Sequence, residues 1–149
     1  MRIHRHAWRS QAGSAAVEFA IVAPFLIALL IGVVELGFAV RQSMQVQDAA
    51  EAGALYAGKH GWDPAGIAAA VVNATGATNI TADPAPALFC ACADSGGIAA
   101  HACDSACGDG DMPVHYARVS ASMPHTAILT GLGLPIPAVL TGHAVVRVQ

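Results

Sequence analysis

The most constraining feature of the sequence is a long apolar run near its start. Residues 19–34 contain no charged side chain, and residues 19–40 contain only Glu35. About 20 apolar residues in a helix cross the hydrocarbon core of a bilayer, so the run is long enough to span a membrane. Pro24 lies inside it, and membrane helices tolerate proline. The sequence therefore predicts a chain anchored by one transmembrane helix.

An acidic residue, Glu18, stands at the start of this run, five residues after Gly13. A carboxylate in a membrane segment costs roughly 2.5–3.5 kcal/mol on insertion scales, so it calls for a functional reason. The preceding residues 1–13 carry three arginines and no acid. Because basic flanks stay cytoplasmic, we expect the N-terminus in the cytoplasm and the C-terminal part outside.

The charges and cysteines of residues 41–149 indicate what kind of domain follows the apolar run. From residue 41 onward there are four basic and eight acidic residues, so a nucleic-acid partner is not expected. The chain is 55% apolar and 11% charged, which is unlike a disordered protein. All four cysteines also follow the span, where an exported domain would meet oxidising conditions that favour disulfides. They are Cys90, Cys92, Cys103 and Cys107.

A helix is compatible with the sequence from about Ala15 to Gly61, which is much longer than a membrane requires. Its second half carries small residues at Ala49, Gly53 and Ala57, spaced to share one face and to allow close approach of another backbone. We expect this face to pack on a small sheet. Asp48 and Glu51 fall on other faces and are expected in solvent.

The remaining elements are predicted from local patterns. Asp63 and Pro64 are typical of a helix start, followed by a short helix over residues 65–74. Residues 88–113 hold the cysteines, several aspartates and much glycine, and are expected to form an irregular cross-linked loop. Residues 116–123 and 138–148 alternate between apolar and polar, as half-buried strands do. In the first strand Arg118, Ser120 and Ser122 are expected on the solvent side.

Taken together, these residues resemble the TadE-like pseudopilins of the tight-adherence (Flp) pilus system. The likeness lies in Gly-Ser-Ala-Ala-Val-Glu-Phe-Ala at residues 13–20, the proline-containing apolar span, and Val-Val-Glu-Leu-Gly at residues 33–37. It continues through residues 46–57 and the two C-terminal strands. Leu55 departs from the pattern, since a basic residue is commoner there.

The resemblance implies that an inner-membrane prepilin peptidase cuts the chain between Gly13 and Ser14. Gly13 has no side chain to obstruct the peptidase, and the new Ser14 amine is, by analogy, a candidate for methylation. Glu18 then becomes the fifth residue of the mature chain. In pilin-like assemblies such an acid is thought to pair with the N-terminal ammonium of a neighbouring subunit, which would offset the cost of burying both charges in lipid.

Other interpretations remain open for the N-terminal half. An ordinary secretory signal peptide would fit the arginines and the apolar core, with Gly37-Phe38-Ala39 as its cleavage site. Glu18 could also be a chance acid that reaches the membrane edge. Glu35 lies about 25 Å beyond Glu18 along a helix, so it either sits at the outer interface or takes part in subunit pairing.

Alternatives also exist for the cysteines and aspartates. Four cysteines allow three pairings, and we expect Cys90 and Cys92 each to pair with Cys103 or Cys107, because a ring from Cys90 to Cys92 would be very tight. The alternative is a metal site that includes His101, although its spacing does not match common zinc patterns. Asp109 and Asp111 suggest calcium but lack the full loop pattern. We therefore expect no metal and no cofactor.

The sequence thus predicts an α+β, pilin-like fold: a long N-terminal helix, membrane-spanning in its first half, packed on a small antiparallel sheet with a disulfide-bearing loop. Residues 1–13 would be a cleaved leader, 14–40 the transmembrane half, and 41–149 an exported domain. The predicted role is that of a non-catalytic pseudopilin of the bacterial inner membrane. Its implied partners are the prepilin peptidase, other pseudopilins, the major pilin, an assembly platform and the lipid bilayer. The alternative is an anchored or secreted disulfide-rich or metal-binding module.

Overall fold

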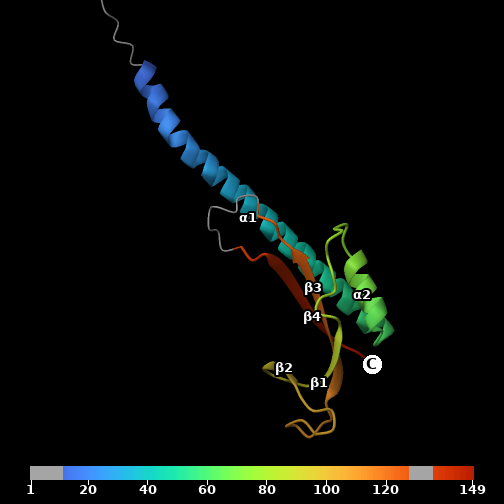
Figure 1. Cartoon of the computed structure of the whole chain (residues 1–149). Helices are drawn as coiled ribbons and strands as arrows, with labels where there is room; N and C mark the ends of the chain where they lie inside the picture. Colours follow the sequence, from blue (N-terminus) through green and yellow to red (C-terminus); the bar gives the residue numbers. More distant parts are fainter. Residues whose placement is uncertain (1–11, 128–135) are drawn as a thin grey trace, which may run out of the picture.

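The computed structural model describes residues 12–127 and 136–149, and they form two helices and one four-stranded sheet (Figure 1). All strand pairs are antiparallel, in the order β2-β1-β3-β4. The predicted α+β class is confirmed. The elements are α1 (Ala12–His60), α2 (Pro64–Asn73), β1 (Ala87–Asp94), β2 (Gly97–Ala100), β3 (Val114–Pro124) and β4 (Val139–Arg147).

Helix α1 is continuous over 49 residues, which corresponds to about 74 Å. Pro24 lies inside it without ending it. The helix stops where the sequence predicts, because Gly61 adopts a positive φ of 78° and its N–H donates to the Ala57 carbonyl at 2.9 Å. Figure 1 shows that its first half projects away from the rest of the domain, while its second half lies against the sheet and α2.

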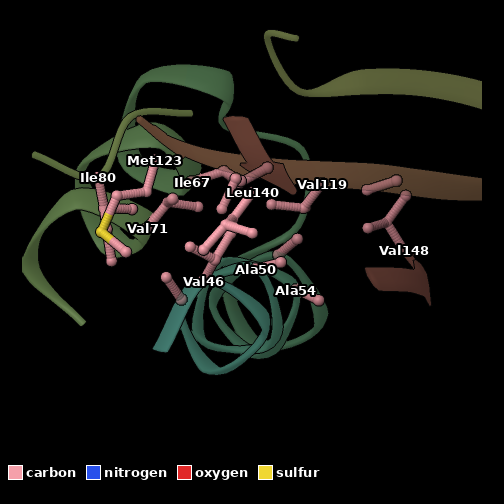
Figure 2. Packing of buried hydrophobic residues seen from close by; sticks show 14 residues of the cluster. Val46, Ala50, Ala54, Ile67, Val71, Ile80, Val119, Met123, Leu140 and Val148 are labelled. Atoms are coloured by element: carbon pink, nitrogen blue, oxygen red, sulfur yellow. The ribbon is translucent and has the colours of Figure 1, made fainter. Parts of the chain in front are cut away.

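The predicted small-residue face of α1 is confirmed as its packing face. Ala49 and Ala57 are fully buried, and a Cβ added at Gly53 would lie 2.6 Å from Val71 Cγ2 and 2.8 Å from Val119 Cγ1. The helix can approach α2 and β3 this closely only because position 53 has no side chain. Figure 2 shows the resulting core, in which residues of α1, α2, β3 and β4 meet. Asp48 and Glu51 are exposed, as expected.

Helix α2 begins as the sequence indicates. Pro64 occupies the first turn, and Asp63 Oδ1 accepts a hydrogen bond from the Gly66 N–H at 3.1 Å. The Tyr56 hydroxyl donates to Asp63 Oδ2 at 3.2 Å and so ties this cap to α1. Ile67 and Val71 point into the core and are fully buried.

Strands β3 and β4 pair over nine positions and form the part of the sheet that packs on α1. Ala117, Val119, Ala121 and Met123 are buried on this face, as predicted. The prediction for the opposite face was partly wrong, because Ser120 and Ser122 are 2% and 8% exposed. Their hydroxyl groups lie 3.1 Å from His143 Nδ1 and from Thr81 Oγ1, respectively. These hydrogen bonds allow small polar side chains to be buried without loss of partners.

The free edge of β4 is partly closed by α1. Gln47 Oε1 accepts from the His143 N–H at 3.2 Å, and Gln47 Nε2 donates to the His143 carbonyl at 3.1 Å. The side-chain amide thus takes the place of a neighbouring strand at one position of an unpaired edge. Gly142 makes the contact possible, since a Cβ there would lie 2.6 Å from the Val46 carbonyl oxygen.

The prediction of an irregular loop over residues 88–113 was wrong for its first half. Residues 87–94 and 97–100 form the hairpin β1–β2, and β1 also pairs with β3. Asp94 Oδ1 accepts from the Gly96 N–H at 2.7 Å in the turn, and Gly97 has a φ of 129°. Residues 101–113 are irregular, as expected.

Candidate processing and assembly site

The predicted cleavage site lies in the first turn of α1. Gly13 is exposed, and a Cβ added to it would meet no atom within 4 Å among the described residues. Glycine in an exposed helix costs about 1 kcal/mol relative to alanine, so packing gives no reason for glycine here. Ser14 follows it in the helix. The start of α1, to which the Gly13–Ser14 bond belongs, is the end of the helix that lies farthest from the sheet (Figure 1).

Glu18 lies on the projecting half of α1, surrounded by exposed apolar side chains. Val17, Phe19 and Ile21 are 61%, 68% and 63% exposed. No residue in the most apolar 18-residue stretch of the helix is buried within the chain. By length and composition, α1 could cross a membrane. Such a surface is suited to lipid or to other apolar helices, and it would place Glu18 inside that environment.

Glu35 has a different environment from Glu18, although both belong to α1. It is only 1% exposed, so the chain itself covers this carboxyl group. A hollow of about 230 Å³ next to it is also lined by Phe38, Gln42, His125 and Thr126. Sequence reasoning did not identify Gln42 or His125, because the two residues are 83 positions apart. Their side chains meet through Gln42 Oε1 and His125 Nδ1 at 2.6 Å, while His125 Nε2 is buried without a hydrogen-bond partner among the residues that the structure describes.

The four cysteines form two disulfides, within the alternatives that the sequence left open. Cys90 joins Cys103 and Cys92 joins Cys107, with Cα–Cα distances of 5.2 and 5.8 Å. Both bonds fasten the irregular segment 101–113 to β1. Sequence separations of 13 and 15 residues correspond to about 3 kcal/mol of stabilisation per bond in the chain-entropy model.

The alternative metal sites find little support in the geometry. His101 Nε2 lies 3.2 Å from Ser105 Oγ and from the Ala106 carbonyl oxygen, so it belongs to the local structure of the loop. His115 is the imidazole whose nitrogen lies within 4.8 Å of the Cys90 and Cys103 sulfurs, and those two sulfurs are bonded to each other. A metal would need them as free thiolates.

The aspartates that suggest calcium, Asp109 and Asp111, line a hollow of about 390 Å³ beside β1. Arg147 lines the same hollow and brings a positive charge to it. Asp109 Oδ1 accepts from the Asp111 N–H at 3.1 Å, as aspartate does in a turn. This hydrogen bond gives Asp109 a structural role in the turn.

The surroundings of Tyr56 change the acidity of its hydroxyl group. The hydrogen bond to Asp63 raises the pKa of the Tyr56 hydroxyl, and burial and the charge of Asp63 act in the same direction. Its ring also stacks on that of His60, with 4.3 Å between the ring centroids. The site joins α1 to the start of α2 and is structural.

These features define a class of protein: a small disulfide-linked α+β domain carried on one long helix whose first half is apolar enough to cross a membrane. A family model described as TadE-like protein matches residues 13–55. The predicted resemblance to the TadE-like family is confirmed over this range. No curated protein and no solved structure matches this chain.

Proposed function

We propose that this protein is a pseudopilin that helps to assemble a tight-adherence pilus. The observation that carries the proposal is the start of the TadE-like match, which begins at Gly13, the residue after which cleavage is predicted. The same match includes Glu18 and the apolar half of α1. In this proposal residues 1–13 are a cytoplasmic leader, 14–40 span the inner membrane, and 41–149 are exported.

Processing and assembly are linked in this proposal by a pair of charges. A prepilin peptidase cuts after Gly13 and leaves an ammonium group on Ser14. Glu18 of one subunit then pairs with the Ser14 ammonium of a neighbour inside the apolar layer. Each charge alone would be costly in lipid, so only correctly registered neighbours are stabilised. The neighbours are other pseudopilins and the major pilin, gathered on an inner-membrane platform, and the protein itself is not a catalyst.

The first test is the N-terminus of the protein purified from membranes, with and without an active prepilin peptidase. Intact mass and N-terminal sequencing should show a peptidase-dependent start at Ser14, with or without a methyl group. The matched variants are Glu18→Gln, which should be cut but fail to support pili, and Asp48→Asn, which should do both. Asp48 is an exposed acid on the same helix, outside the apolar half.

Two results would overturn the proposal. A start near Val40 would indicate a cleaved signal peptide and leave a secreted disulfide-rich domain. An intact Met1 in the presence of the active peptidase would indicate a permanently anchored module that is not a pseudopilin. Normal pili from the Glu18→Gln variant would remove the charge pair from the mechanism and leave the processing step.

A further inference from the structure

Two short segments of the domain lie beside α1 at the level of Glu35 and Gln42. They are residues 125–127, directly after β3, and residues 136–139, which lead into β4. The His125 side chain contacts Gln42, with Nδ1 and Oε1 2.6 Å apart. The His125 N–H donates to the Ala138 carbonyl at 2.8 Å, which places the second segment at the same level.

The length of α1 places this level at the outer surface of a membrane. From Ser14 to Glu35 is 21 residues, or about 32 Å, and from Ser14 to Gln42 is 28 residues, or about 42 Å. A hydrocarbon core is about 30 Å thick, and about 40–45 Å with the headgroup layers. If Ser14 stands at the cytoplasmic boundary, residues 35–42 cross the outer headgroup layer.

The composition of the chain at this level suits that position. Residues 119–146 contain no Asp, Glu, Lys or Arg, so the whole connection from β3 to β4 is uncharged. Large apolar side chains are exposed at this end: Val139 is 53% exposed, and Leu36 and Phe38 on α1 are 57% and 49% exposed. The polar side chains of Thr126 and Arg41 are exposed at the same level, as suits the headgroup layer. The apolar surface of the helix therefore continues onto the end of the sheet, and the exposed charge at this level is that of Arg41 on α1.

We propose that this end of the domain rests on the lipid surface, with residues 125–127 and 136–139 at the boundary between headgroups and acyl chains. The bilayer is the occupant because the patch continues the membrane-facing surface of α1. The burial of Glu35 fits this position, because the domain covers the carboxyl group at the level where the helix leaves the hydrocarbon. It gives the domain a second attachment to the membrane. This inference rests on the membrane anchoring of the proposed function.

The test uses single-tryptophan variants of the full chain in vesicles of phosphatidylethanolamine and phosphatidylglycerol. Trp8 and Trp62 are replaced by phenylalanine, and one tryptophan is introduced by Val139→Trp, Leu29→Trp or Ile98→Trp. All three positions are exposed, so the substitutions fit without repacking. Nitroxide-labelled phosphatidylcholine, labelled at the headgroup or deep in the acyl chain, serves as the quencher.

The Val139→Trp variant should be quenched several-fold more strongly by headgroup-labelled lipid than the Ile98→Trp variant, whose residue lies in β2. The Leu29→Trp variant should respond most to the deep label. Equal quenching of the Val139→Trp and Ile98→Trp variants, with normal deep quenching of Leu29→Trp, would overturn this inference and leave the anchor intact. Loss of deep quenching in Leu29→Trp would overturn the anchor itself, and with it both this inference and the proposed function.

Discussion

The two halves of α1 have opposite relations to their surroundings, although they form one uninterrupted helix. In the first half the large apolar side chains are exposed, as at Phe25 and Leu29, which are 74% and 63% exposed. In the second half the residues that pack are small, as at Ala49 and Gly53. Large apolar side chains fill the space around a helix in lipid, whereas small ones let a backbone approach a sheet. The comparison shows that apolar content alone does not define a core.

The largest difference between the two halves is expected when the same charge is placed on each. Leu29 and Leu55 are 63% and 65% exposed on the same helix. Leu29→Arg should disfavour membrane insertion by about 3 kcal/mol, because the guanidinium would enter the hydrocarbon. Leu55→Arg should insert normally. Membrane fractionation of both variants measures the difference, and equal partitioning would show that residue 29 is not in lipid.

Replacing one glycine in each half of α1 compares how closely the two halves pack. Gly53→Val should destabilise the domain by about 2–3 kcal/mol, since the added atoms would collide with Val71 and Val119. Gly32→Val should leave the domain unchanged, because a Cβ at position 32 meets no atom within 4 Å among the described residues. Urea unfolding followed by circular dichroism in detergent compares the two. Similar midpoints would contradict the packing described for α1.

A smaller effect is expected where α1 closes the edge of β4. Gln47→Ala should cost about 1 kcal/mol, because both backbone groups of His143 lose the amide that pairs with them. Gln47→Glu keeps the acceptor for the His143 N–H but places a carboxylate against the His143 carbonyl oxygen and Glu51, which both accept from Gln47 Nε2 in the parent. It should therefore cost at least as much stability as Gln47→Ala. Hydrogen exchange at the His143 amide reports the change directly. Unchanged exchange in Gln47→Ala would show that solvent replaces the amide without loss.

The smallest effect concerns pH. The pKa of Tyr56 is raised in the folded chain, so the hydrogen bond to Asp63 contributes stability below the ordinary pKa of tyrosine, and this contribution is lost as pH rises through the raised value. Tyr56→Phe should be less stable than the parent at neutral pH, and the difference should shrink at alkaline pH. Unfolding midpoints across this range provide the measurement. A difference that does not change with pH would assign the effect to ring packing on His60.

The sequence was sufficient for elements whose signals are local. The apolar run without a break predicts α1, and the Asp63–Pro64 pair predicts the start of α2. The spacing of Ala49, Gly53 and Ala57 indicates the packing face. Each of these depends on residues within a few turns of one another.

The rest depends on contacts between distant residues. Strand β1 is rich in alanine and cysteine and has weak strand propensity, so it forms through pairing with β3, as between Ala87 and Arg118. The burial of Ser122 requires Thr81, which is 41 positions away. The meeting of Gln42 and His125, and the hollow beside Glu35, follow from the return of the chain to α1 after β3. No pattern among neighbouring residues in the sequence predicts such contacts.

The continuity of α1 has a mechanical consequence. A force that draws the helix along its own axis reaches the sheet through a long lateral contact, because Gly142 packs near Val46 and Val146 packs near Gly58. Strand β4 and the helix therefore run side by side, and such a load acts in shear on many contacts at once rather than peeling them apart singly. The domain would follow its helix as one body under such a load.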